Sequence, residues 1–280
     1  MSTEHMDGRP QRNLTALSIA GFDPGSGAGI TADLLTFAQF GVFATSAITA
    51  LTVQSTRGVR RVEPVSADLL HDTLQELEAD LPADGIKVGM LGSAPQVEVV
   101  ARFLQQVRSK RPITVVLDPV LVSSSGAILL DPAGLGAMQR ELLPFVDAVT
   151  PNAPEAAVLT GMPCASELDA ERCAAELCGR YPKLVPVVTG GHLEPPSDLV
   201  LWEGSPTWIA GRRLQSRSTH GTGCVFSSAL LAAFLHKGDW LAAARQAKAF
   251  VTAAMQNATP RGSGCGPLNL LGKPKPISAS

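Results

Sequence analysis

The chain has 280 residues, of which 45% are hydrophobic and 17% charged, and its formal net charge is −2. Such a near-neutral chain has no general field for nucleic acid or an anionic membrane, so any bound anion must be held by local groups. The longest helix-like apolar run, residues 225–235, is well short of the roughly 20 residues of a membrane span. Five irregularly spaced cysteines give no disulfide framework. We therefore expect a cytoplasmic protein without a membrane or nucleic-acid partner.

Short runs rich in Val, Ile and Thr alternate with longer runs of helical periodicity, a pattern typical of repeated βα units on a mostly parallel sheet. Strands are expected at 14–20, 43–50, 85–88, 113–117, 148–150 and 185–189, with helices between them at 28–40, 67–81, 95–109, 132–142, 154–160 and 167–180. A hairpin of strands 199–202 and 207–210 follows, and then helices 224–236 and 240–256. The pattern predicts an α/β fold with a single domain over 14–267, a flexible leader at 1–13 and an irregular tail at 268–280.

The loop after the first expected strand is dense in glycine, reading Gly21-Phe22-Asp23-Pro24-Gly25-Ser26-Gly27-Ala28-Gly29. Ligands of open α/β sheets bind beyond the carboxyl ends of the strands, so this loop could let the backbone approach a small ligand. It lacks the third glycine of a dinucleotide-binding loop because Ile30 stands there, and no Walker A lysine follows. With Asp33 one turn into the next helix, both a ligand loop and a simple tight turn remain open.

The strongest pattern is Thr219-His220-Gly221-Thr222-Gly223-Cys224, which runs directly into an apolar helix. The two glycines let successive amides point one way, and a helix start adds free N–H groups and a positive dipole end. The segment therefore predicts a site for phosphate or a developing oxyanion. A thiol at this place should have a pKa lowered from about 8.5 toward neutrality, which makes Cys224 a candidate base or nucleophile. The alternative is an inert core cysteine.

Two carboxylates follow other strands. Asn152-Ala153-Pro154-Glu155 has the form of a capping box, which by itself explains the pattern. Alternatively Glu155, together with Asp118 of Asp118-Pro119-Val120, could hold a hydrated Mg²⁺, which prefers one or two carboxylates plus phosphate oxygens.

Three further strand exits carry polar or soft groups. Thr189-Gly190-Gly191-His192 offers donors suited to phosphate, while Gln54 and Met90 could supply an amide and a thioether to a small heterocycle. The signal at residues 189–192 is weak by itself, and for the Gln54 and Met90 segments an ordinary loop is the simpler explanation.

Taken in this order, the segments resemble the hydroxymethylpyrimidine/phosphomethylpyrimidine kinases of thiamin biosynthesis, within the ribokinase-like superfamily. The resemblance extends from Leu14 to Pro267. It includes Ser18-Ile19-Ala20-Gly21-Phe22-Asp23-Pro24, Lys87-Val88-Gly89-Met90-Leu91, Thr150-Pro151-Asn152 and the Thr219–Cys224 segment. The last is the most specific, because most of the superfamily has Asp at the end of this motif, where this branch and some pyridoxal kinases have Cys.

The resemblance implies a three-layer α/β/α fold and a homodimer. It also implies Mg²⁺-assisted transfer of the γ-phosphoryl group of ATP to 4-amino-5-hydroxymethyl-2-methylpyrimidine, and then to its monophosphate. Cys224 would accept the hydroxyl proton while Gly221, Thr222 and Gly223 hold the phosphoryl group, and Asp118 and Glu155 would hold Mg²⁺. The implied pyrimidine contacts are Ala28, Asp33, Gln54, Met90 and Val120, and the implied nucleotide contacts are Asn152, Thr189, Gly191, His192 and Thr219.

The sequence departs from the pattern where lysines are concerned. Thr189 stands where some relatives have Lys before Gly-Gly-His, and residues 121–126 lack a lysine found in some members, so the efficiency of the second phosphorylation stays open. A pyridoxal or pyridoxine kinase is the first alternative function. A non-catalytic ligand-binding regulator with the same fold is the second, and a nicotinamide-dependent oxidoreductase is disfavoured by the missing third glycine.

Overall fold

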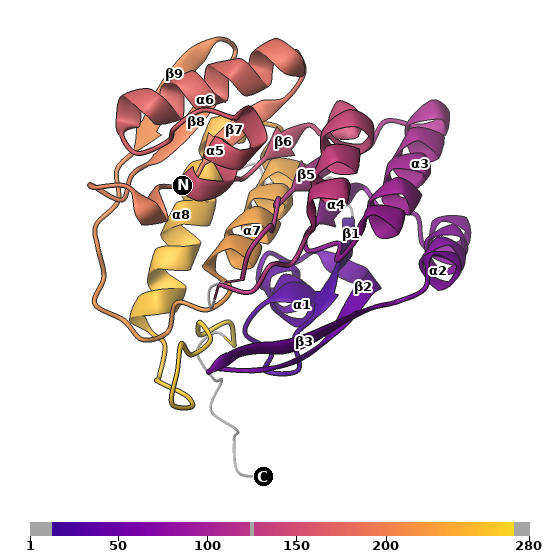
Figure 1. Cartoon of the computed structure of the whole chain (residues 1–280), viewed down its shortest axis with the longest axis horizontal. Coiled ribbons are helices and arrows are strands. Elements are labelled where there is room, and N and C mark those ends of the chain that lie inside the picture. The colour runs from indigo at the N-terminus through magenta and orange to yellow at the C-terminus, as the bar shows by residue number, and fades with distance from the viewer. Residues whose placement is uncertain (1–12, 124–125, 272–280) are drawn as a thin grey trace, which may run out of the picture.

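The core of the protein is a twisted sheet between two layers of helices (Figure 1). The computed structural model describes residues 13–123 and 126–271. Within these residues the sheet has nine strands in the order β3-β2-β1-β4-β5-β6-β7-β8-β9. The strands are β1 (Thr15–Phe22), β2 (Phe43–Ser55), β3 (Gly58–Pro64), β4 (Gly85–Val88), β5 (Thr114–Leu117), β6 (Ala148–Val149), β7 (Val185–Val188), β8 (Asp198–Trp202) and β9 (Ser205–Ile209).

The sheet is parallel from β2 to β7, and only β3, β8 and β9 join it by antiparallel pairing. The helices of the described residues are α1 (Gly29–Gln39), α2 (Ala67–Asp80), α3 (Ala94–Lys110), α4 (Pro132–Ala137), α5 (Ala153–Thr160), α6 (Glu167–Arg180), α7 (Thr222–Lys237) and α8 (Trp240–Gln256). None of them is both long and apolar enough to cross a membrane. The predicted α/β class with a mostly parallel sheet and three layers is confirmed.

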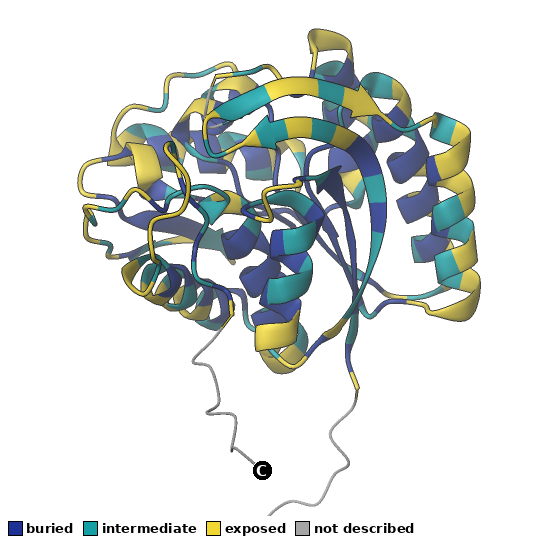
Figure 2. Ribbon diagram, turned by 90° about the horizontal axis from the view of Figure 1, so that it is seen from below, coloured by how far each residue is buried: buried dark blue, intermediate teal, exposed yellow. Residues whose placement is uncertain are grey.

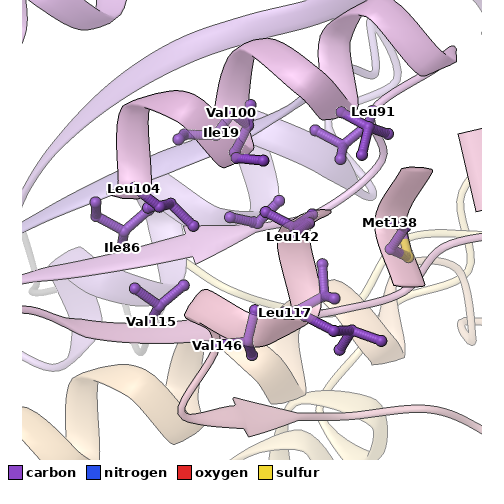
Figure 3. Packing of buried hydrophobic residues seen from close by; sticks show 14 of the residues in the cluster. Ile19, Ile86, Leu91, Val100, Leu104, Val115, Leu117, Met138, Leu142 and Val146 are labelled. Carbon is purple, nitrogen blue, oxygen red and sulfur yellow. The ribbon is translucent and has the colours of Figure 1, made fainter. Parts of the chain in front are cut away.

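Alternate residues of the central strands belong to different cores, as the two-residue period of a strand requires. On β5, Val115 and Leu117 pack with α3 and α4, whereas Val116 packs with α7 and α8. Figure 3 shows the first of these cores, with Leu104 of α3 beside Ile86 of β4. Each fully buried side chain of this size contributes about 1.5–3 kcal/mol, so the parallel strands are fixed from both faces.

The hairpin of β2 and β3 was not predicted. β2 continues five residues past the expected end at Ala50, and Leu51 and Val53 on this extension are half exposed. Figure 2 shows the hairpin with its mixture of exposed and intermediate residues. Helices do not cover both faces of this hairpin, so it lacks the apolar run that indicates the other strands. In the sequence, the residues of β3 therefore resemble a polar loop.

Two other expectations need correction. The expected helix 132–142 is α4 followed by a π-helical turn, Met138–Leu142, and a 3₁₀ turn, Leu143–Phe145. The tail at 268–280 is irregular over its described part, but Leu268 and Leu270 are buried in the core beside α7 and α8, so the folded domain continues beyond residue 267. The leader at 1–13 lies outside the described residues except for Asn13.

Candidate active site

The carboxyl ends of the parallel strands meet at one edge of the sheet, where two glycine-rich segments touch. We call residues 21–29 the first loop and residues 219–224 the glycine loop. A Cβ atom at Gly221 would collide with the carbonyl oxygen of Gly27, and a Cβ at Gly27 would collide with the ring of His220. Gly221 also has a φ of +80°, which favours glycine. The glycines therefore let the two loops pack backbone to backbone.

Asp23 organises the inside of the first loop. Its carboxylate accepts hydrogen bonds from the amides of Gly25 at 2.7 Å, Gly27 at 3.1 Å and Ala28 at 3.0 Å. The same group lies 2.8 Å from Nε2 of His220 in the glycine loop. The loop's amides thus bind an anion of the chain itself, so the first loop is not a free phosphate-binding loop.

The environment of Asp23 keeps it ionised. Burial alone would raise the pKa of Asp23, but hydrogen bonds from His220, Gln54 and the amide of Gly25 lower it to about 2. Neither Asp23 nor His220 was assigned a role from the sequence. The available signal was an Asp directly before the Pro-Gly of a turn, a position at which its side chain often binds nearby amides.

Helix α7 begins at the glycine loop, as the sequence predicted. Gly221 is its N-cap and provides no side-chain cap, so the first amides of the helix keep their donors for a ligand. Gly223 is exposed there, and a Cβ on it would lie 3.5 Å from Oδ2 of Asp118. The predicted anion site and the Asp118 carboxylate are therefore neighbours.

The predicted low pKa of Cys224 is wrong. Burial, together with the charges of Asp118 and Asp33, raises the pKa of the Cys224 thiol to about 12, against the lowering effects of Lys87 and the amide of Gly29. The helix start by itself favours a low pKa of this thiol. In the structure, desolvation and two carboxylates outweigh it, so Cys224 is a neutral thiol in the free protein.

Asp118 and Glu155 are brought together at the ends of β5 and β6. The capping box is present: Asn152 Oδ1 accepts from the Glu155 amide and Glu155 Oε2 accepts from the Asn152 amide, both at 2.9 Å. Glu155 nevertheless also lies close enough to Asp118 for their charges to interact. Burial and the charge of Asp118 raise the pKa of Glu155 to about 8, and burial raises that of Asp118 to about 6 despite Lys87.

Two buried carboxylates that repel each other are suited to a divalent cation. Mg²⁺ needs only one or two protein carboxylates, since water and phosphate oxygens supply its other ligands. No group of three acidic, His or Cys side chains in 13–123 and 126–271 forms a complete protein-made metal cage. Asp118 and Glu155 therefore fit a hydrated Mg²⁺ that is shared with a phosphate-bearing ligand.

Asp33 is buried, and its contact with a pyrimidine stays a prediction. Its side chain has no exposed surface and forms an ion pair with the equally buried Lys87, Nζ to Oδ2 being 2.8 Å. The Asp33 carboxylate is thus already paired inside the protein. Lys87 itself was missed, although a lysine within the apolar strand Gly85-Ile86-Lys87-Val88 is a visible signal, because lysine is almost never fully buried unless paired.

The other expected pyrimidine residues lie near one another. Met90 packs in a small cluster with Val120, and its Cε would be 2.9 Å from a Cβ at Gly21. Gln54 is hydrogen-bonded to Asp23, which also binds the amide of Ala28. Their contact with a substrate stays a prediction.

A cavity of about 270 Å³ opens beside Gln54 and His220. Its walls are the turn of the β2–β3 hairpin and the segment after α8, and its lining residues are Gln54, Ser55, Thr56, Arg57, Gly58, Val59, Ser123, His220, Gly264 and Cys265. A second cavity of about 280 Å³ lies at the amino ends of β4 and β5 and contains none of the predicted residues. The first cavity is therefore the one that fits the strand exits.

The expected nucleotide residues flank the exits of β6 and β7. Asn152 and Thr189 form a parallel β-bridge, and Gly191 and His192 follow in an exposed 3₁₀ turn. Thr219 begins the glycine loop and is partly buried. These residues share the same edge of the sheet, and their contact with a nucleotide stays a prediction.

Known proteins match most of the chain. The family model for phosphomethylpyrimidine kinase matches residues 23–269. A hydroxymethylpyrimidine/phosphomethylpyrimidine kinase of Haemophilus influenzae is 41% identical, over 90% of this chain and 95% of its own length. The kinase of that name from Aquifex aeolicus is 38% identical, over 90% of this chain and 98% of its own length.

Solved structures agree with these relatives. The crystal structure of phosphomethylpyrimidine kinase from Clostridium difficile 630 has a TM-score of 0.76 and 30% identity, and the match covers 86% of this chain and 99% of that chain. Pyridoxal kinase from Staphylococcus aureus in complex with pyridoxal has a TM-score of 0.82 and 27% identity, covering 93% and 94%. On the family model and the identity to these relatives, the chain belongs to the phosphomethylpyrimidine kinase family.

Proposed function

We propose that the protein transfers the γ-phosphoryl group of ATP to 4-amino-5-hydroxymethyl-2-methylpyrimidine and then to its monophosphate, for thiamin biosynthesis. The observation that carries the proposal is the glycine loop at the start of α7, with Cys224 beside the Asp118 carboxylate, whose charge also acts on Glu155. Phosphoryl transfer needs positioning and charge stabilisation more than covalent catalysis, and this arrangement offers both.

In this proposal, the free amides at the start of α7 bind the transferring phosphoryl group. Asp118 and Glu155 would hold Mg²⁺, which supplies positive charge to the phosphate oxygens. The remaining work falls to the chain's own residues. Gln54 and His220 line the cavity that would hold the heterocycle, and Met90 and Val120 would offer it an apolar surface.

Cys224 would accept the hydroxyl proton late in the transfer. Burial and the charges of Asp118 and Asp33 raise the pKa of its thiol, so the free protein holds no ready thiolate. Positive charge placed near these carboxylates would offset their effect and lower the pKa of the Cys224 thiol. The base would then become available only once the site is loaded, which limits wasteful transfer to water.

The test is ATP consumption with the pyrimidine alcohol and with its monophosphate, assayed separately at equal concentrations. The proposal expects turnover of both. Turnover of the alcohol alone would restrict the function to the first transfer, and this outcome has a specific reason, since Thr189 stands where some relatives have a lysine.

Pyridoxal is the second candidate substrate. The similarity to the S. aureus pyridoxal kinase favours it, because that structure contains pyridoxal and matches over 93% of this chain. Both substrates present a hydroxymethyl group on a flat nitrogen heterocycle. Turnover of pyridoxal without turnover of the pyrimidine would replace the first proposal.

We also propose that Mg²⁺ is required and that the protein is a cytoplasmic homodimer. The carboxylate pair supports the metal, and the family resemblance supports the dimer. Assays with and without a chelator, sizing in solution and cell fractionation test these three statements separately.

A further inference from the structure

A buried ion pair lies beneath the candidate active site. Lys87 and Asp33 have no exposed side-chain surface, and Nζ lies 3.0 Å from Oδ1 and 2.8 Å from Oδ2. Burying two charges carries a large desolvation cost, and apolar side chains of similar volume often give equal or greater stability. The ion pair is therefore better explained by the groups that it holds in position than by stability alone.

The Asp33 carboxylate ties four elements together. Ser18 of β1 donates to Oδ2 at 2.6 Å, and Ser228 of α7 donates to Oδ1 at 2.8 Å. Lys87 brings in β4, and Asp33 itself lies on α1. Because α1 follows the first loop and α7 follows the glycine loop, this one carboxylate joins the helices that carry both loops.

The positions along the two helices match the active site. Ser228 is four residues after Cys224, and Asp33 is four residues after Gly29, so each lies one turn below on the same face of its helix. The amide of Gly29 is hydrogen-bonded to the thiol of Cys224. The hydrogen bond between Ser228 and Asp33 lies one turn below the hydrogen bond between Gly29 and Cys224. It therefore helps to fix the geometry of that contact at the site.

Lys87 adds a positive charge at the same place. A Cβ at Gly89 would lie 2.7 Å from Nζ, so the ammonium group sits directly behind the loop that follows β4. Its charge acts on both Cys224 and Asp118. In an interior of low dielectric constant such a charge is weakly screened, and it favours negative charge on these two groups.

We propose that Lys87 is a positioning residue for phosphoryl transfer, which acts through Asp33 to hold Ser228 and the start of α7 against the first loop. The inference rests on the proposed function. It adds that Lys87 sets the rate of transfer without touching the substrate.

The sharpest test compares Ser228→Ala with Ser18→Ala. Each variant removes one hydroxyl that donates to the same buried carboxylate and leaves the Lys87–Asp33 ion pair in place, but only Ser228→Ala releases α7. We expect Ser228→Ala to lower kcat by about tenfold, since small misplacement of reacting groups costs rate. The KM for the pyrimidine should stay within about twofold, because we place the heterocycle in the cavity beside Gln54. Ser18→Ala should keep kcat within about twofold.

Hydrogen exchange provides a readout that needs no substrate. Amides in the first turn of α7 should exchange faster in Ser228→Ala than in the wild type, while Ser18→Ala leaves them unchanged. Equal kcat in the two serine variants, or faster exchange without loss of kcat, would overturn the proposal. If the wild type phosphorylates neither the pyrimidine nor pyridoxal, the proposed function has failed instead.

Lys87 is tested directly by the double variant Asp33→Asn with Lys87→Gln, which keeps hydrogen-bonding groups and removes both charges. We expect a folded protein whose kcat falls by at least tenfold with little change in pyrimidine KM. A matched double variant of the ion pair between Arg111 and Glu78, which joins α2 to the residue after α3, should keep kcat. A folded Lys87 variant with wild-type kcat would overturn the proposal, and if it does not fold, the two serine variants decide.

Discussion

His220 and Asp23 are 197 positions apart in the chain, yet His220 Nε2 lies 2.8 Å from Asp23 Oδ2. This contact joins the glycine loop to the first loop, and the amides of Gly25, Gly27 and Ala28 complete the set of donors around the carboxylate. The two loops therefore share one buried charge. Changes to Asp23 should consequently be felt on both sides of the site.

Asp23→Asn should reduce stability in a pH-dependent way. The pKa of Asp23 falls from 3.8 to about 2 on folding, so its ionised form stabilises the fold above pH 4, and this contribution disappears as the pH falls toward 2. The shift corresponds to about 2 kcal/mol. Urea unfolding of both proteins should give a difference that is largest near pH 5 and shrinks steadily in acid. A difference independent of pH would contradict the prediction.

Cys224→Ala should lower kcat by a factor on the order of 10² to 10⁴ if the thiol is the base. The KM for ATP should change little. Cys178→Ser is the control, because this cysteine lies on α6 away from the site. Since burial raises the pKa of Cys224 to about 12, iodoacetamide at pH 8 should modify it more slowly than the exposed Cys265, as measured by peptide mass spectrometry. An unchanged kcat would remove Cys224 from the mechanism.

Gly221→Ala and Gly238→Ala form a matched pair at the two ends of α7. Both positions have positive φ, +80° and +69°, so each alanine costs about 1–2 kcal/mol of backbone strain. Only at Gly221 would the new Cβ collide with the carbonyl oxygen of Gly27, whereas nothing lies within 4 Å at Gly238. We expect Gly221→Ala to lose activity by at least about 10²-fold and Gly238→Ala to keep it. Equal activity in the two would show that close packing of the loops is unnecessary.

Glu155→Gln should stabilise the metal-free protein at pH 8. The pKa of Glu155 rises from 4.5 to about 8 on folding, so its ionisation opposes folding increasingly as the pH rises through this range. Glutamine keeps the acceptor for the Asn152 amide and removes the repulsion with Asp118. Thermal unfolding in chelator should therefore show a higher midpoint for the variant, and added Mg²⁺ should raise the wild type more. Glu167→Gln, in the exposed first turn of α6, should show neither effect.

The parallel strands and the glycine loop could be predicted because their signals are local. Apolar runs indicated the strands that are buried on both faces, and the glycines before an apolar run indicated the start of α7. β3 could not be found in this way, since none of its residues is buried and the strand depends on pairing with β2. Leu268 and Leu270 were missed for a similar reason, because only the folded chain provides the core that covers them.

The electrostatics of the site could not be predicted from local sequence patterns. The position of Cys224 at a helix start suggested a low pKa, but burial and Asp118 reverse it. Asp33 was expected at the substrate, while the structure pairs it with Lys87 from a distant strand. In both cases the deciding neighbours are far away in sequence, so their effect can be read only once the fold is known.

The pairing of early and late segments has a consequence for synthesis. Asp23 of the first loop contacts His220. Thr56 of the hairpin turn accepts a hydrogen bond from the amide of Gly264, 208 positions later. Contacts of such large sequence separation form late, because the intervening loop must first be closed. On a ribosome, the strands from β1 to β7 can pair while the site is still open. A nascent chain that ends after β9 but before residue 264 would therefore contain all the strands described here and no complete cavity, so catalytic competence arrives only with the last part of the polypeptide.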